Sequence, residues 1–189
     1  GAVGYVVISR KDKDSKNEQP QQSSDMARPE DVPECTPDIK DAFQKAPFDI
    51  DQVKVVTPGK ETNDPRFVYP WVKTATTDRV NIYAPAEGRL YMIRHKVYEI
   101  DGKKGNDYDI FFEVDCKTVY RFNHISNPRE DIKATYPAGD LPSGDYANGG
   151  VDIPERVKPK TAIKVKAGES LGYTTGTPTA RNFDFAVGI

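Results

Sequence analysis

Two stretches decide the fold: RVNIYAPAEGRL at residues 79–90 and KVKAGESLGYTTGT at residues 164–177. In each stretch a short alternation of apolar and polar residues, which is typical of a β-strand, runs into glycine. The glycines are Gly88 in the first stretch and Gly168 and Gly172 in the second. Glycine accepts positive φ without strain and lets two backbones approach closely, as tight strand corners require. We therefore predict a mainly all-β domain, a barrel or sandwich closed by pairing the middle of the chain with its last quarter.

The chain is long enough for one such domain with extensions, but not for two full domains, because it has 189 residues. The predicted segments are the end of a membrane anchor at residues 1–10, a flexible linker at 11–34, a helix and a wrapping arm at 35–78, and a β domain at 79–189 with a loop insertion at 126–161.

The charge distribution argues against a nucleic-acid partner. Lys and Arg total 27, Asp and Glu total 29, and the formal net charge is −2. The chain therefore lacks the basic stripe that binding to a phosphate backbone requires.

The first residues, GAVGYVVIS at residues 1–9, are apolar and are followed at once by charged residues. They are too few to cross a bilayer, which needs about 20 apolar residues. We interpret them as the end of a membrane anchor; the alternative is a stray β-strand or a cloning remnant. If the anchor exists, the domain lies outside the cytoplasm, where the two cysteines, Cys35 and Cys116, can form a disulfide.

A short helix is predicted to begin at Thr36-Pro37-Asp38, because threonine caps helices and proline suits the first helical position. It should end by Pro47. The arm that follows, at residues 49–77, contains an aromatic cluster of Phe67, Tyr69 and Trp71. We expect these aromatic side chains to cover the core, with a sugar-stacking platform as the alternative.

The central part of the chain alternates as strands do. We predict strands at residues 90–100, 108–114 and 118–125, with a glycine-rich connection at 101–107 between the first two. The proline- and glycine-rich stretch at 126–161 is long for a structureless loop in a small domain, so it is either functional or a decorated excursion.

The order of four motifs resembles a known family. APAEGRL at residues 84–90, FNHIS at 122–126, VKAGESLGYTTGT at 165–177 and NFDF at 182–185 follow the order of the lysostaphin-type zinc endopeptidases. These murein-cleaving enzymes have Ala-Pro-x-x-Gly, Tyr-x-His-Leu, Val-x-x-Gly-x-x-Ile-Gly and His-Leu-His-Phe motifs. The resemblance implies their fold, a barrel-sandwich hybrid with the duplicated hybrid motif.

The resemblance implies a lost zinc site. In the family, zinc is held by a His and an Asp upstream of Ala-Pro and by the second His of His-x-His. Here Asn182-Phe183-Asp184 replaces His-x-His, and the only two histidines are His95 and His124. The family-equivalent catalytic positions are His124 and Asn182, and the equivalent metal position is Asp184. We therefore expect a non-catalytic member that lacks the zinc cofactor of the family.

The remaining polar residues suggest a binding cleft. Asn182 and Asp184 alternate along the last strand and share one face, which lines the cleft in the enzymes. His124, Asn182 and Asp184 could therefore bind a cell-envelope glycan, peptide or protein without cutting it. The alternative for His124 is a hydrogen-bonded structural residue, and we expect His95 to lie on a solvated strand face.

Three functions follow from these patterns. The first is a membrane-tethered, extracytoplasmic binding or scaffold module without hydrolytic activity. The second is an active zinc metallopeptidase with an altered ligand set, such as Asp184 and His124 with another carboxylate. The third is a biotinyl or lipoyl carrier domain, for which Lys103-Lys104 is the only candidate attachment site.

Overall fold

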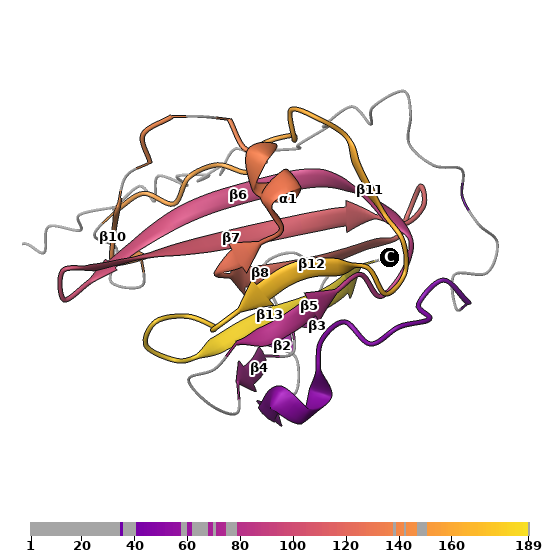
Figure 1. Ribbon diagram of the computed structural model, residues 1–189, viewed down its shortest axis with the longest axis horizontal. Helices are drawn as coiled ribbons and strands as arrows, with labels where there is room; N and C mark the ends of the chain where they lie inside the picture. The colour runs from indigo at the N-terminus through magenta and orange to yellow at the C-terminus, as the bar shows by residue number, and fades with distance from the viewer. Residues whose placement is uncertain are drawn as a thin grey trace, which may run out of the picture. The chain divides into compact units, whose positions relative to one another are not determined.

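A computed structural model gives the structure of the chain (Figure 1). It describes residues 35, 41–57, 60–61, 68–69, 71–74, 79–137, 139–141, 143–146 and 151–188. The predicted anchor at 1–10 and linker at 11–34 lie outside these residues, and the predicted segment boundaries stay predictions. Within the described ranges, no helix is long and apolar enough to cross a membrane.

The described residues form one large and two small β-sheets. The large sheet runs in the order β1 (Val53–Val56), β4 (Trp71–Thr74), β13 (Asn182–Gly188), β8 (Val119–Ile125), β7 (Lys103–Glu113), β6 (Gly88–Ile100) and β10 (Ser143–Gly144), and β11 (Ile163–Val165) also pairs with β6. The small sheets are β5 (Val80–Tyr83), β12 (Ser170–Thr174) and β9 (Asn127–Pro128), and the pair β2 (Lys60–Glu61) and β3 (Val68–Tyr69).

The all-β class and the pairing of the middle of the chain with its last quarter are confirmed. β5 pairs with β12, and the start of β6 pairs with β11, both antiparallel. The expectation of a closed barrel is wrong, because β1 and β10 are the two ends of the large sheet and do not pair with each other. The physical reason is that the strands divide between sheets that pack face to face: after β5 the chain leaves the small sheet at Pro85, which cannot donate to a strand ladder, and enters the large one as β6.

The core lies between one face of the large sheet and the β5–β12–β9 sheet. Its fully buried side chains include Ile82 and Leu171 from the small sheet and Phe112, Phe122 and Phe183 from the large one. Burying large apolar side chains of this kind contributes roughly 1.5–3 kcal/mol each. The two sheets are therefore held face to face mainly by aromatic and branched aliphatic packing.

Two glycines allow the close backbone approaches that the sequence predicted. Gly172 has φ +127°, and a Cβ there would lie 2.7 Å from the Pro128 Cα. At Gly88 a Cβ would lie 2.9 Å from the Glu113 carbonyl oxygen. Real Cβ atoms do not approach backbone atoms this closely, so neither position accepts a side chain without a shift of the neighbouring strand.

The β6–β7 hairpin turns at only two residues. Asp101 and Gly102 have φ of +51° and +71°, as the two central residues of a type I′ turn require. The expected connection at 101–107 is therefore too long, since β7 begins at Lys103. The short turn fixes the register, which places Lys96 opposite Asp107 and Arg94 opposite Asp109.

The insertion at 126–161 contains short elements of regular secondary structure and is not a structureless loop. It contains β9, the short helix α1 (Glu130–Ala134) and β10. Ile132 of α1 is fully buried in the core, and Val157 exchanges two backbone hydrogen bonds of 2.9 Å with Ile93 of β6.

The N-terminal part differs from its prediction. The expected helix start at Thr36-Pro37-Asp38 lies outside the described residues, and residues 42–47 are not helical. Instead, Phe43 and Phe48 pack against the core, and the 3-10 turn η2 (Ile50–Gln52) leads into β1. The predicted arm does more than wrap the domain, because β1 and β4 extend the large sheet beyond β13. The side chains of the aromatic cluster lie outside the described residues.

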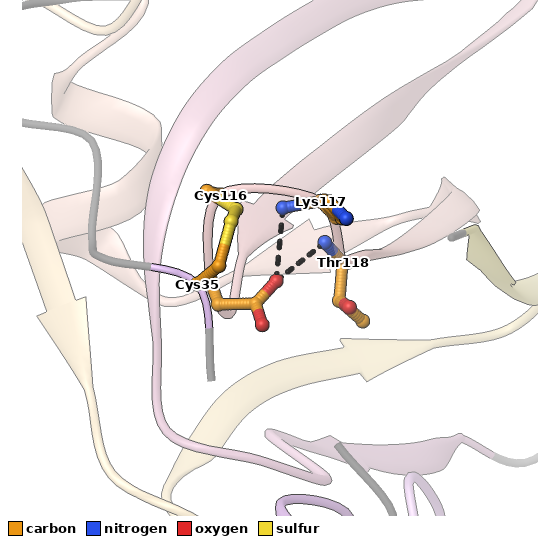
Figure 2. Close-up of a disulfide and its surroundings, with 5 residues drawn as sticks. Cys35, Cys116, Lys117 and Thr118 are labelled. Carbon is orange, nitrogen blue, oxygen red and sulfur yellow. Dashed lines mark hydrogen bonds between the residues drawn. A yellow bond between two sulfur atoms is a disulfide. The ribbon is translucent and has the colours of Figure 1, made fainter. Parts of the chain in front are cut away.

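A disulfide joins Cys35 to Cys116 across a sequence separation of 81 (Figure 2). Cys116 lies in the turn between β7 and β8. The Asp115 carboxylate accepts hydrogen bonds from the backbone N–H groups of Lys117 and Thr118, at 2.9 and 2.7 Å. The N-terminal segment is thus tied to a turn whose shape is already fixed by its own side chain.

Replacing both cysteines should lower stability while leaving the fold intact. A crosslink that closes a loop of this size is expected to contribute about 4–5 kcal/mol by limiting the unfolded chain. We therefore expect C35S/C116S to unfold at a lower urea concentration than the unaltered protein, with an unchanged far-ultraviolet circular dichroism spectrum. Mass spectrometry of the unaltered protein without reductant should find no free thiol, and two alkylated cysteines would contradict the pairing.

Candidate functional site

A buried ion-pair cluster lies on the β6–β7 hairpin and the adjoining strands. We call it the Lys96 cluster. Its members are Arg94 and Lys96 from β6, Asp107 and Asp109 from β7, His124 from β8 and Asp184 from β13.

The centre of the cluster is the ammonium group of Lys96. Its Nζ lies 3.3 Å from Asp107 Oδ1 and 3.2 Å from Asp109 Oδ1. The three side chains are only 5%, 3% and 0% exposed. The hairpin register causes this arrangement, because an antiparallel pair holds directly opposed side chains about 4.5–5.5 Å apart at Cβ.

Asp109 is held by a second cation. Arg94 donates to Asp109 Oδ2 through Nε at 2.7 Å and also through Nη2. Burial alone would raise the pKa of Asp109, but the charges of Lys96 and Arg94 outweigh burial and hold that pKa well below its usual range. Asp109 is therefore an ionised, fully paired carboxylate.

His124, the penultimate residue of β8, has a left-handed conformation with φ +64°. Its carbonyl oxygen accepts a 2.5 Å hydrogen bond from Thr174 Oγ1, and its ring Nδ1 lies 2.7 Å from Asp107 Oδ2. Burial lowers the pKa of His124, but the hydrogen bond and the charge of Asp107 outweigh burial and raise the pKa above its usual 6.5. The contact with Asp107 thus fixes the orientation of the His124 ring, which is a partly exposed hydrogen-bond donor at the edge of the Lys96 cluster.

Asp184 faces the other ring nitrogen. Its Oδ2 lies 3.9 Å from His124 Nε2 and accepts a 3.4 Å hydrogen bond from Asn123 Nδ2. Burial raises the pKa of Asp184 above that of an ordinary aspartate, although the nearby His124 opposes this. Its buried Oδ1 has no hydrogen-bond partner among the described residues.

The structure brings together two of the three expected site residues. His124 and Asp184 meet, as described above. Asn182 takes part in a different interaction: its Oδ1 accepts a 2.6 Å hydrogen bond from Thr177 Oγ1, and its carbonyl oxygen accepts one from the Thr177 backbone N–H at 2.8 Å. Asn182 therefore fixes the turn that leads into β13.

Sequence reasoning missed the charged residues that organise the cluster. The strand that carries His95 among Arg94 and Lys96 was expected to have a solvated polar face, but Arg94 and Lys96 are paired with Asp109 and Asp107. His95, on the other face of β6, is half-buried, and its ring stacks on Tyr108 at a centroid distance of 4.0 Å. The missed signal is the Asp-Gly turn at 101–102, because a two-residue turn there fixes which charges of β6 and β7 are opposite one another.

The cluster offers a set of metal-ligand types but no vacant centre. Single ligand atoms of Asp107, Asp109 and His124 all lie within 4.8 Å of one another, and imidazole with carboxylates is a common ligand set for zinc. However, the cation Lys96 Nζ lies 3.3 Å from Asp107 Oδ1 and 3.2 Å from Asp109 Oδ1, and His124 and Arg94 contact the other oxygen of each carboxylate. Asp107 Oδ1 has this ion pair but no hydrogen bond among the described residues. In this arrangement the residues do not fit an ion.

Comparison of the chain with protein-family models, with curated proteins and with solved structures gave no match. Functional inference therefore rests on the geometry of the chain itself.

The only two histidines of the chain should titrate on opposite sides of pH 6.5. Burial lowers the pKa of His95, whereas Asp107 raises that of His124. A two-dimensional NMR titration of the imidazole signals should therefore show one midpoint below and one above 6.5. The His95→Gln variant assigns the signals, and it should remove the lower midpoint. Two coincident midpoints near 6.5 would contradict the burial of His95 and the His124–Asp107 contact.

Proposed function

We propose that this protein is a binding or scaffold module, built on a metallopeptidase-like β domain, that has no hydrolytic activity. The observation that carries the proposal is the position of Lys96 Nζ, between Asp107 Oδ1 and Asp109 Oδ1 at 3.3 and 3.2 Å. A cation of the chain itself thereby pairs with two of the three residues, Asp107 and Asp109, whose ligand atoms lie close enough together to hold a metal.

The chemistry of an ammonium group supports this proposal. Hydrolysis by zinc needs a metal that polarises a carbonyl group and lowers the pKa of a bound water, with one coordination position left open. The Lys96 ammonium has three N–H donors and no acceptor. It can neutralise carboxylates, but it can neither polarise a carbonyl group nor lower the pKa of a bound water as zinc does. Zinc beside Lys96 and Arg94 would also place like charges a few ångströms apart in a buried site, where repulsion is weakly screened.

Partly exposed polar groups support ligand binding at the edge of the cluster. The side chains of His124 and Asp184 are 23% and 12% exposed, so both can reach a polar partner. An imidazole beside a carboxylate offers a ring nitrogen and an acceptor oxygen for hydrogen bonds. This combination suits a glycan hydroxyl or a peptide group of the cell envelope, as predicted from the sequence.

The disulfide supports an extracytoplasmic location, since such bonds persist in oxidising compartments and are rare in the cytosol. We propose on this basis that the domain works outside the cytoplasm. The membrane tether at residues 1–10 belongs to the same proposal, and its support is the apolar sequence alone.

A second candidate function is a metallopeptidase with an altered ligand set. The observation that favours it is the proximity of Asp107, Asp109 and His124, which replaces the set of Asp184 and His124 with another carboxylate expected from the sequence. For zinc to bind there, the Lys96 ammonium would have to move away from Asp107 and Asp109. The carrier-domain alternative keeps Lys103-Lys104 as its attachment site, and a mass increase on either lysine after native expression would support it.

Removing the Lys96 ammonium should create a zinc site. We expect the unaltered protein to retain no zinc after dialysis against the metal, as measured by elemental analysis. Lys96→Ala removes the cation that Asp107 and Asp109 share and leaves them with His124 and Arg94, and breaking a buried ion pair should cost roughly 3–5 kcal/mol of stability. Zinc should then raise the melting temperature of Lys96→Ala by coordinating Asp107, Asp109 and His124.

Lys104→Ala is the matched control, because it removes an ammonium group from the same hairpin at an exposed position. It should neither bind zinc nor lose comparable stability. Near-stoichiometric zinc in the unaltered protein, together with peptidase activity, would overturn the proposal in favour of the metallopeptidase.

A further inference from the structure

A hollow of about 420 Å³ lies on the opposite side of the β6–β7 hairpin from the Lys96 cluster. Successive side chains of a strand point to opposite faces, so His95 and Tyr108 line the hollow while their neighbours Lys96 and Asp107 belong to the cluster. Figure 1 draws α1 over β6 and β7, and Tyr136, just after α1, forms another part of the wall. The volume falls within the range of small-ligand sites in proteins.

One wall of the hollow is a preformed aromatic stack. The His95 and Tyr108 rings are nearly parallel, with an interplanar angle of 5°, and the Tyr136 ring meets His95 edge-on at 5.7 Å. Asn106 Oδ1 lies 2.9 Å from His95 Nε2 and holds the imidazole in the plane of the stack. Tyr108 is buried and backs His95, so the half-buried rings of His95 and Tyr136 provide the accessible aromatic surface. A rigid surface of this kind loses little entropy when a ligand binds.

Polar groups of both kinds surround this wall. Lys133 Nζ donates to Asn127 Oδ1 and Glu130 Oε1, and an ammonium group has three N–H donors, so these two hydrogen bonds leave one N–H for a ligand. Lys104 is 65% exposed and lies 3.7 Å from Glu99, and exposed pairs of this kind are weak enough to exchange partners. The exposed carboxylate of Asp140 adds an acceptor at the rim.

We infer that this hollow is a binding site for a saccharide ring. Sugar rings have apolar C–H faces that pack on aromatic rings, and their adjacent hydroxyl groups both donate and accept hydrogen bonds. His95 and Tyr136 match the first property, and Lys133, Lys104 and Asp140 match the second. The lysines are offset by Glu99, Glu130 and Asp140, so the site contains no excess of positive charge that would demand an anionic ligand. This inference goes beyond the proposed function, because it places a separate saccharide site on the face of the hairpin opposite the His124–Asp184 edge.

The two histidines of the chain report separately on the two faces. The experiment follows the imidazole NMR signals while a trisaccharide of N-acetylglucosamine is added. Two further titrations use maltotriose and a uronate trisaccharide for comparison. The inference predicts that the His95 signals shift in a saturable manner while the His124 signals stay in place. Comparison of the three trisaccharides shows whether the hollow binds a neutral, an N-acetylated or an acidic sugar ring.

Matched variants test the lining residues. Tyr136→Ala should weaken binding about tenfold, as expected for the loss of an aromatic stacking partner, whereas Tyr173→Ala, at a half-buried tyrosine of β12 outside the hollow, should leave binding unchanged. Lys104→Met should weaken binding several-fold, while Lys103→Met, the same change one residue away, should not.

Two results would overturn the inference. Shifts of the His124 signals without shifts of His95 would place the sugar at the Lys96 cluster, which would leave the proposed function intact. No shift of either histidine with any of the three trisaccharides would exclude a saccharide site in the hollow. In that case zinc retention by the unaltered protein would decide separately whether the proposed function stands.

Discussion

The interaction on which the site depends is the burial of one lysine between two aspartates of the neighbouring strand. Taking charges out of water is costly, and the cost is recovered only where opposite charges meet with good geometry. Lys96 meets Asp107 and Asp109 at 3.3 and 3.2 Å because the β6–β7 register leaves no other arrangement. That register in turn depends on the turn at Asp101 and Gly102, where both residues take positive φ. A local backbone constraint thus determines the electrostatics of the whole sheet face.

The same hairpin has two faces with different chemistry. One face carries the Lys96 cluster, where charges neutralise one another and no position is left for an ion. The other face carries the aromatic stack of His95 and Tyr108, which ends in an open hollow beneath the insertion at 126–161. The insertion thereby helps to form the hollow, since α1 and the described residues after it supply its far wall. The disulfide lies elsewhere, at the turn between β7 and β8, where it ties Cys35 to Cys116.

The sequence was sufficient for much of the fold and for part of the site. Alternation and the glycines predicted the all-β class, and the steric limits at Gly88 and Gly172 show why those positions were informative. A two-residue turn at Asp-Gly pairs residue 100 with 103. Counting outward from that pair places Lys96 opposite Asp107, as the structure does, so the centre of the cluster was also within reach of the sequence. The proximity of His124 to Asp184 was expected only from the family resemblance. Residue patterns alone do not show it, because it depends on the left-handed conformation of His124 and on the pairing of strands distant in sequence. The open edge of the large sheet was also out of reach, since closure depends on how two sheets pack rather than on any one strand.

The central claim is that the Lys96 ammonium, rather than a metal ion, occupies the space between Asp107 and Asp109. The most direct measurement is a crystal structure of the unaltered protein grown in excess zinc, with diffraction data collected at the zinc absorption edge. The account predicts that Lys96 Nζ lies within hydrogen-bonding distance of both carboxylates and that no anomalous peak lies between them. An anomalous peak coordinated by Asp107, Asp109 and His124, with Lys96 displaced from the centre, would contradict it.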